Sequence, residues 1–295
     1  MQPDIDAVQV LRRPDGVSIA CRKWSATSRP AGLIVLLHGA ASNLTRWSQF
    51  VRETTLKSAW DIVRPDLRGH AGSLVRGRTG MDLWCRDIAA IIDAQGHSRA
   101  VLAGHCLGAN IALQFAHRYP QKTRGLILIE PMLPAAQAGK LRAVRLMRPC
   151  LVALAAGIRI LNRAGIYRRR LPALDLEALD RETRLAMASE RSTRSLTERY
   201  ASPWQDLKFM PTASFIGDLL AVSAPLPPLS AIHAPSLALL STGAAFSRLA
   251  RTRDLLARLA GCRVITLEAR HWIPTEAPDA MREAIERWCA DLAPE

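Results

Sequence analysis

Residues 100–109 have the sequence Ala-Val-Leu-Ala-Gly-His-Cys-Leu-Gly-Ala, and the rest of the chain can be interpreted from this segment. Its first four residues are apolar, which is typical of a buried strand in a parallel sheet. The run stops at Gly104, and apolar residues resume at helical spacing with Leu107, Ile111 and Phe115. The segment therefore predicts a strand, a sharp turn and a helix, with Cys106 at the apex of the turn.

The pattern Gly104-X-Cys106-X-Gly108 is typical of a turn that presents a nucleophile, with cysteine in the place where serine is commoner. Small flanking residues let strand and helix approach closely around a strained central residue. The N–H groups at the start of the helix favour a thiolate and later an oxyanion. Because glycines flank many turns, the pattern also fits a buried structural cysteine, and the remaining chain has to distinguish the two.

The rest of the chain alternates between strand-like and helix-like segments. Strands are predicted at residues 7–11, 17–24, 33–37, 62–65, 125–129, 236–240 and 264–267, and helices at 44–59, 81–95, 248–259 and 277–289. This alternation predicts a mainly parallel sheet with right-handed crossovers. Residues 132–230 interrupt it with a basic, helix-like, proline-punctuated stretch, which we expect to lie above the carboxyl ends of the strands, where ligands of α/β proteins bind.

Composition narrows the class of protein. The chain has 295 residues, 49% of them hydrophobic and 22% charged, which suits one domain with an insertion or two domains. Residues 1–6 lack the features of a signal peptide, and the apolar stretch 150–158 is too short to cross a bilayer. Six scattered cysteines without paired spacing argue against a disulfide framework or a zinc site, so a cytoplasmic location is predicted.

The formal net charge of +14 permits two interpretations. One is an anionic partner, such as nucleic acid, a membrane surface or a substrate on a phosphorylated carrier. The other is an ordinary solvated surface rich in arginine, which is favoured over nucleic-acid binding because no nucleic-acid motif accompanies the charge. Basic residues concentrate at Lys140, Arg142, Arg145, Arg148, Arg159, Arg163 and Arg168–Arg170, where they could steer an anionic substrate or carrier.

Four motifs occur in the order found in the α/β-hydrolase superfamily. They are His38-Gly39, Asp66-X-Arg68-Gly69-His70-X-X-Ser73, the 104–108 turn, and His271-Trp272 with Glu276-X-Pro278. The chain resembles this superfamily over nearly its whole length, in the branch with a helical cap after the sixth strand. The resemblance implies a mainly parallel eight-stranded sheet, with a core at residues 1–131 and 231–295 and a helical cap at 132–230.

Together the motif and the resemblance assign candidate roles. Cys106 is the expected nucleophile, which would attack a carbonyl and form a thioester, and it should be the only cysteine that iodoacetamide alkylates rapidly. His271 is the expected base. The N–H of Leu107 is one expected oxyanion donor by geometry and that of Ala40 is the other by resemblance. Alternatively, Cys106 takes the place of a former catalytic serine in a family member that is not an enzyme.

The acid of a catalytic triad is less obvious. The family pattern usually offers an aspartate after the seventh strand, but Ser241–Arg248 contains no carboxylate. Glu130, at the end of the strand that follows the elbow helix, is predicted to orient His271 instead. Three alternatives remain: Glu130 only caps its strand, the site is a Cys-His dyad, or Asp218, Glu268 or the cap supplies the acid.

These residues favour an acyl hydrolase of esters, thioesters or lactones. An acyltransferase or cyclase of the same fold is the first alternative, and a lyase or non-catalytic binding protein the second. We expect no metal, no organic cofactor and no nucleic acid. The expected substrate is a small acyl compound, and one version of this hypothesis makes it anionic or attached to a carrier. The sequence does not indicate the oligomeric state. The apolar segments Leu151–Leu161 and Phe215–Val222 fit either an acyl pocket or the packing of the cap.

Overall fold

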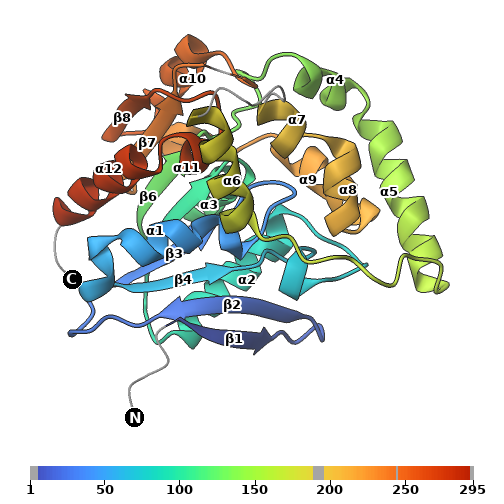
Figure 1. The fold of residues 1–295 in the computed structure, drawn as a ribbon, viewed down its shortest axis with the longest axis horizontal. Coiled ribbons are helices and arrows are strands. Elements are labelled where there is room, and N and C mark those ends of the chain that lie inside the picture. Colours follow the sequence, from blue (N-terminus) through green and yellow to red (C-terminus); the bar gives the residue numbers. More distant parts are fainter. Residues whose placement is uncertain (1–5, 189–195, 244, 293–295) are drawn as a thin grey trace.

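The computed structural model describes residues 6–188, 196–243 and 245–292, which form an eight-stranded sheet with helices on both faces (Figure 1). The strands are β1 (Ala7–Arg12), β2 (Ser18–Trp24), β3 (Leu33–Leu37), β4 (Asp61–Pro65), β5 (Ala100–His105), β6 (Thr123–Ile129), β7 (Ser236–Ser241) and β8 (Cys262–Leu267). Their order is β1-β2-β4-β3-β5-β6-β7-β8. β2 is antiparallel to both neighbours and all other pairs are parallel.

The five strands from β4 to β7 in this order are buried along their whole length, whereas the edge strands β1 and β8 are partly exposed. Alternate residues serve the two faces: Leu33, Val35 and Leu37 pack on one side of β3, and Ile34 and Leu36 on the other. A strand covered on both faces needs an unbroken apolar sequence, which is why these strands were recognisable without an alternating pattern.

Two groups of helices cover the sheet. One face carries α2 (Met81–Ala94), α3 (Leu107–Arg118) and α10 (Leu249–Leu256), and the other carries α1 (Ser48–Glu53), α11 (Ile273–Glu276) and α12 (Pro278–Ala290). Short 3₁₀ helices lie at η1 (Leu44–Trp47), η2 (Thr55–Ser58), η3 (Ala71–Ser73), η4 (Pro120–Lys122) and η5 (Leu229–Ala231). The predicted α/β architecture is therefore present.

One predicted helix is interrupted. The sequence predicts a single helix over 44–59, but the chain there forms η1, α1 and η2, with Thr54 extended at ψ 141°. Glu286 of α12 accepts hydrogen bonds from the Thr54 hydroxyl and the Thr55 N–H, both at 2.8 Å. This carboxylate lies more than 200 positions away in the sequence, so local spacing gave no sign of the break.

A set of helices separates β6 from β7. It comprises α4 (Lys140–Leu146), α5 (Arg148–Arg163), α6 (Leu176–Ala188), α7 (Leu196–Tyr200), α8 (Pro203–Phe209) and α9 (Thr212–Val222). In this inserted segment α9 contacts α3 and α6 contacts α11, so it lies against the end of the sheet from which α3 and α11 begin (Figure 1). Within the predicted core and cap, residues 1–5, 189–195 and 293–295 lie outside the described residues. No helix in the described part of the chain is long and apolar enough to cross a bilayer.

Candidate active site

Cys106 stands at the apex of the turn between β5 and α3. Its backbone adopts φ 53° and ψ −111°, and its N–H donates to the Ile129 carbonyl at 2.9 Å. A Cβ on Gly104 would come within 2.2 Å of the Gly108 carbonyl carbon, and one on Gly108 within 2.3 Å of the Leu37 carbonyl oxygen. Both flanking positions therefore require glycine for the turn to close. The half-buried thiol faces the cavity described below.

His271 lies between β8 and α11 and is 3% exposed. Its Nδ1 is 3.1 Å from Glu130 Oε2, and its ring also hydrogen-bonds the Cys106 side chain. Burial lowers the pKa of His271, but the hydrogen bonds with Cys106 and Glu130 and the charges of both outweigh it and raise the pKa to about 9. An imidazolium beside a cysteine favours the thiolate, which is the nucleophilic form.

Glu130 follows the last residue of β6 and is 5% exposed. Oε2 faces His271, and Oε1 accepts the Ser241 N–H at 2.5 Å. The last residue of β7, directly before the loop where the family pattern usually has an aspartate, thus contributes a backbone donor to this carboxylate. Asp218, the alternative acid, contacts His70 instead of His271.

Backbone strain concentrates at this site. Among the described residues, five non-glycine residues have a positive φ, and Ala41, Cys106 and Glu130 are three of them. A left-handed conformation costs such residues about 1–2 kcal/mol each, so it persists only where the surroundings enforce it. Strain that gathers at one place is a reason to regard that place as functional.

The oxyanion donors predicted from the sequence lie beside the thiol. Within the described residues, the backbone N–H groups of Ala40 and Leu107 donate to no backbone acceptor. The next N–H, that of Ala41, is bound by Asp218 Oδ2 at 3.0 Å. The two unpaired donors are therefore available to a developing negative charge.

Two carboxylates hold loops of the site, a role that the sequence analysis assigned to neither. Asp218 of α9 accepts from Ala41 N–H and contacts His70 Nε2 at 2.8 Å, and this pairing raises the pKa of His70 despite the burial that lowers it. Glu276 accepts the backbone N–H groups of residues 270, 271 and 272 at 2.9–3.2 Å. Glu276 stood in a quoted motif, whereas Asp218 was named only as an alternative acid, and the sequence did not indicate its contacts with Ala41 and His70.

Two other histidines near the site have structural contacts. His38 Nδ1 is 2.8 Å from the Gly39 carbonyl and its Nε2 accepts from Leu67 N–H at 3.0 Å. His105 Nε2 lies 3.1 Å from the His271 carbonyl. Burial and a neighbouring histidine hold the pKa of both rings well below the usual value. Neutral imidazoles of this kind shape the loops without carrying charge.

A cavity of about 590 Å³ opens above Cys106 and His271. Its wall is mostly apolar and comes largely from the inserted segment, including Leu141, Val144, Leu174, Leu176, Leu179, Phe209, Phe215, Leu219 and Val222. Its polar lining includes Arg46, Arg199, Asp206 and Asp218. Burial and the charge of Asp218 raise the pKa of Asp206 to about 7.

Of the two apolar segments that fitted either an acyl pocket or the packing of the cap, only 215–222 lines the cavity. Phe215, Leu219 and Val222 line the cavity, but no residue of 151–161 does. α5, which contains 151–161, buries only Ala155, because it contacts α9 along one side and is otherwise exposed. This helix therefore does not form the pocket, and it packs inward with Leu151, Ala155 and Ile158 while its other apolar residues are exposed.

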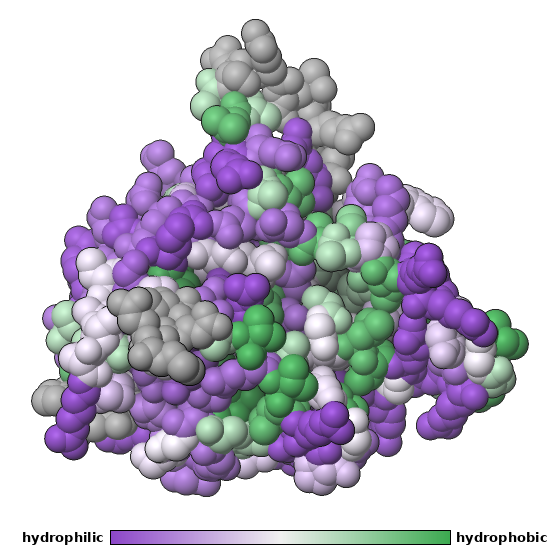
Figure 2. Space-filling view, turned by 60° about the horizontal axis from the view of Figure 1, so that its bottom comes forward, coloured by the Kyte–Doolittle hydropathy of each residue, from purple (hydrophilic) through white to green (hydrophobic). Residues whose placement is uncertain are grey.

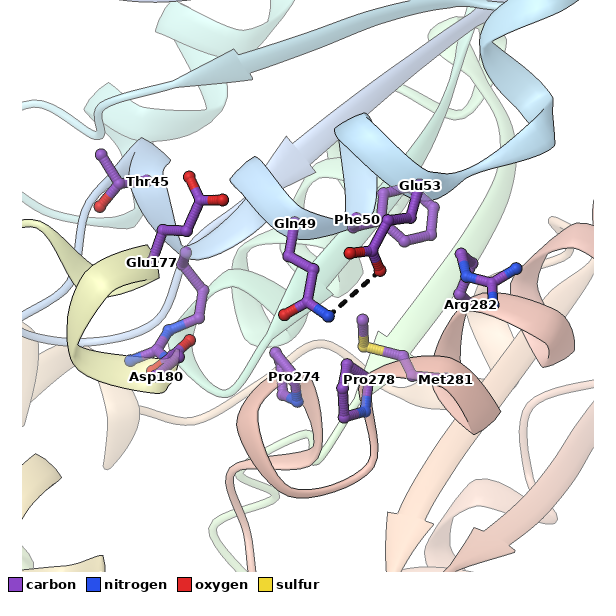
Figure 3. Close-up of a pocket in the computed structure, with 11 residues that line it drawn as sticks. Thr45, Gln49, Phe50, Glu53, Glu177, Asp180, Pro274, Pro278, Met281 and Arg282 are labelled. Atoms are coloured by element: carbon purple, nitrogen blue, oxygen red, sulfur yellow. Dashed lines mark hydrogen bonds and ion pairs between the residues drawn. The ribbon is translucent and has the colours of Figure 1, made fainter. Parts of the chain in front are cut away.

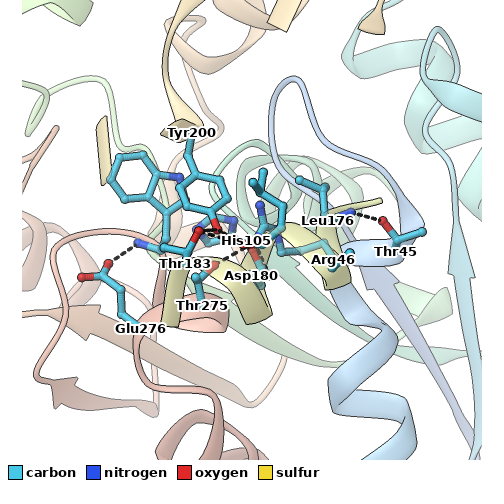
Figure 4. A network of polar contacts seen from close by, with 12 residues as sticks. Thr45, Arg46, His105, Leu176, Asp180, Thr183, Tyr200, Thr275 and Glu276 are labelled. Carbon is cyan, nitrogen blue, oxygen red and sulfur yellow. Dashed lines mark hydrogen bonds and ion pairs between the residues drawn. The ribbon is translucent and has the colours of Figure 1, made fainter. Parts of the chain in front are cut away.

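A polar network anchors the inserted segment beside the His271 loop (Figure 4). Arg46 Nη1 lies 2.6 Å from both carboxylate oxygens of Asp180 on α6 and 2.8 Å from Thr275 Oγ1 on α11. The Tyr200 hydroxyl of α7 contacts Asp180 at 2.8 Å and Thr183 at 2.9 Å. These contacts fix α6 and α7 over the candidate site.

A second, much smaller cavity lies between α1, α6 and α12 (Figure 3). Its volume is about 10 Å³, room for a single water molecule, and Gln49 bonds Glu53 at 3.1 Å on its wall. It cannot hold a substrate. Within the ranges that the structure describes, no group of three or more histidine, cysteine or acidic side chains is placed to hold a metal ion.

The remaining cysteines differ from Cys106. Burial raises the pKa of Cys21 and Cys262 to about 11 and that of Cys85 and Cys289 to about 12. Cys150, however, is exposed on α5. The expectation that Cys106 alone reacts rapidly therefore needs a Cys150→Ser background to be tested cleanly.

Comparison with known proteins was made at the level of sequence and of structure. A family model described as "alpha/beta hydrolase fold" matches residues 32–149. An uncharacterized protein of Mycobacterium tuberculosis is 33% identical over 112 residues, 35% of this chain and 30% of that protein. The chain spans about a third of the length of the curated relatives it matches.

Solved structures match over nearly the whole chain. A hydrolase from Pseudomonas aeruginosa PA01 has a TM-score of 0.69 at 21% identity and covers 98% of this chain and 99% of its own. The enol-lactonase from Burkholderia xenovorans LB400 has a TM-score of 0.68 at 19% identity, covering 96% of this chain and 100% of its own. At these identities the likeness shows a shared fold.

Proposed function

We propose that this chain belongs to the α/β-hydrolase superfamily, whose family model matches residues 32–149, and that it is an acyl hydrolase that acts through a cysteine acyl-enzyme. The observation that carries the proposal is the position of the His271 imidazole, which is hydrogen-bonded to the Cys106 thiol on one side and to the Glu130 carboxylate on the other. Nucleophile, base and orienting acid then form a triad.

The first half-reaction acylates the cysteine. His271 is protonated near neutral pH, because its pKa is raised to about 9, and the proposed mechanism begins with Cys106 as the thiolate. The Cys106 sulfur attacks the carbonyl carbon of an ester, thioester or lactone, and the carbonyl oxygen becomes an oxyanion. The N–H groups of Ala40 and Leu107 stabilise that oxyanion. The tetrahedral intermediate collapses, the bond to the leaving group breaks, and His271 gives its proton to the leaving oxygen or sulfur.

The second half-reaction hydrolyses the thioester. Neutral His271 takes a proton from water, whose oxygen attacks the acyl carbon, and the same two N–H groups stabilise the oxyanion again. Collapse releases the carboxylic acid and returns the thiolate of Cys106 beside the imidazolium of His271. Throughout, Glu130 keeps Nδ1 protonated, which leaves Nε2 for the proton transfers.

Residues 132–230 are proposed to act as a helical cap that selects the substrate, over a core of residues 1–131 and 231–295. The apolar lining from α4, α6, α8 and α9 favours a hydrophobic acyl group in a small-molecule substrate. In the described residues all six cysteines are free thiols, which supports a reducing compartment such as the cytoplasm.

The test measures hydrolysis of p-nitrophenyl esters, acyl thioesters and lactones near neutral pH by the wild type and the Cys106→Ala and Cys150→Ser variants. We expect turnover by the wild type and Cys150→Ser, and only background with Cys106→Ala. Equal turnover by Cys106→Ala would contradict the proposal. Acyl transfer to an added alcohol or amine in preference to water would instead assign the chain to the acyltransferases.

A further inference from the structure

The helix α5 exposes an unusual amount of apolar surface. Of the fourteen large hydrophobic residues that are exposed in the described part of the chain, eight lie between residues 146 and 167. They are Leu146, Met147, Val152, Leu154, Ile160, Leu161, Ile166 and Tyr167, with exposed fractions from 42% to 82%. Large apolar residues scattered singly on a surface are ordinary, but a concentration of this kind marks an interaction surface.

The exposed residues follow the period of the helix. Positions 150, 153, 154, 157, 160 and 161 are spaced by three and four, so they share one side of α5, and all six are exposed. We call this side the α5 outer face. It consists of cysteine, alanine, leucine, glycine and isoleucine only, whereas the single buried residue, Ala155, lies on the opposite side. A surface helix normally turns its apolar side toward the core, and α5 turns it toward solvent.

The helix stands at the periphery of the molecule. Figure 1 shows α5 at the right-hand edge, outside α8 and α9, with its axis running along the surface. Figure 2, turned about the horizontal axis, shows hydrophobic residues at that same side set among strongly hydrophilic ones. Asn162 Nδ2 donates to the Arg76 carbonyl at 3.1 Å, and the Arg76 guanidinium lies 4.1 Å from the centre of the Tyr167 ring. The end of the helix is thus held in place.

The segment that contains α5 is strongly basic. Residues 131–174 contain one lysine and eight arginines but no aspartate or glutamate. Within the described ranges, none of these eight arginines forms a salt bridge. Arg145, Arg148 and Arg168 donate to backbone carbonyls, and Arg159 is partly buried. Arg163, Arg169 and Arg170 are exposed and are available to an external anion.

We propose that the α5 outer face and its flanking arginines dock the protein on an anionic lipid surface. An interfacial helix needs an apolar side that enters the headgroup region and basic residues that meet anionic lipids. The outer face of α5 supplies the first, and the exposed arginines at and beyond its end, Arg163, Arg169 and Arg170, supply the second. Nucleic acid would leave the apolar side unused. A second copy of the chain would bring two strongly positive segments together. The surface adjoins the large cavity, since Leu141 and Val144 of α4 line the cavity while Leu146 and Met147 are exposed. The inference does not depend on the proposed function.

The test is co-sedimentation of the full chain with vesicles of phosphatidylcholine alone or with about one-third phosphatidylglycerol. We expect binding only to the anionic vesicles, and weaker binding as salt rises. The Leu154→Ser/Ile160→Ser variant should bind at least about tenfold more weakly, because two buried aliphatic side chains are lost. Neutralising Arg163, Arg169 and Arg170 to glutamine should weaken binding about 100-fold, because each basic residue at the surface contributes a factor of about five.

The matched control is Leu185→Ser/Met187→Ser, which removes two exposed apolar residues of α6 outside the surface and should bind like the wild type. Absence of binding to anionic vesicles at low salt would overturn the proposal. The proposal would also be overturned if the arginine variant lost vesicle binding and Leu154→Ser/Ile160→Ser kept it, because the protein would then adsorb by charge alone. A dimer in light scattering that Leu154→Ser/Ile160→Ser converts to a monomer would assign the face to self-association and overturn it as well.

Discussion

Replacing Glu130 by glutamine probes the triad most sharply, because it removes one charge and keeps the shape of the side chain. Glu130 contacts His271 Nδ1 at 3.1 Å through Oε2 and accepts Ser241 N–H at 2.5 Å through Oε1. In Glu130→Gln, the amide oxygen must stay on Ser241 N–H, so the amide NH₂ faces Nδ1. The imidazole must then protonate Nε2, the nitrogen that serves Cys106, which is the wrong tautomer for catalysis.

The expected loss has two parts. A hydrogen bond to a charged group contributes about 1.5–3 kcal/mol, which corresponds to about 10-fold to 150-fold in rate if it is lost in the transition state. The wrong tautomer adds to this, so kcat for a p-nitrophenyl ester should fall at least about 100-fold while KM changes little. Removal of the carboxylate should also lower the pKa of His271, which the pH profile of acylation would record.

The matched control is Glu268→Gln, the same chemical change at an exposed position three residues before His271. It should retain wild-type kcat. Stopped-flow measurement of p-nitrophenol release separates acylation from deacylation in each variant. Glu130→Gln within about threefold of the wild type would refute the role of Glu130 and favour a Cys-His dyad.

Three other changes follow from the geometry. Asp218→Asn should lower kcat about 10-fold to 100-fold with little change in KM, because it loosens the Ala41 turn beside the oxyanion donor. An equal loss of kcat in Asp206→Asn would mean that the lost negative charge, and not the lost hydrogen bond to Ala41, causes the effect. Gly108→Ala should lower the free energy of unfolding in urea by about 1–3 kcal/mol or prevent folding, because its Cβ would lie 2.3 Å from a carbonyl oxygen. The control Gly157→Ala, whose Cβ would have no atom within 4 Å, should be neutral or stabilising. Equal effects of the two substitutions would contradict the turn geometry. The contribution of His271 to stability, measured against His271→Gln, should be full below pH 6.5 and lost as pH rises through about 9, because its pKa is raised on folding; a contribution that grows over this range would contradict that shift.

Strands and helices that are determined by their own residues were predictable from the sequence. The strand at 33–37 is an unbroken apolar run because both of its faces are covered, and its position agrees with the prediction. The strand at 100–105 begins with such a run and continues through Gly104 and His105, beyond the predicted end of the run. The helix predicted at 44–59 was wrong in its continuity, because the break at Thr54 depends on Glu286. The inserted segment was predicted to be helical, but its spacing alone could not reveal that α5 turns its apolar side toward solvent.

The same division holds for the candidate site. The turn around Cys106 follows from two glycines that permit one backbone geometry, so a short motif located it. Glu130 was inferred from an absence, the missing carboxylate in 241–248, and the structure puts it beside His271. Asp218 could not be assigned to Ala41, because 177 positions separate them and only the packing of α9 brings them together.

The central claim is that Cys106 carries the acyl group. Intact-mass measurement of the Cys150→Ser protein, mixed for short times with activated esters and acyl thioesters, tests it most directly, with peptide mapping to locate the adduct. The account predicts one acyl group, on Cys106, that forms before product accumulates and disappears when substrate is exhausted, and no adduct in the Cys106→Ala/Cys150→Ser variant. Turnover without any acyl-enzyme, or an adduct on another residue that forms and decays at the rate of turnover, would contradict it.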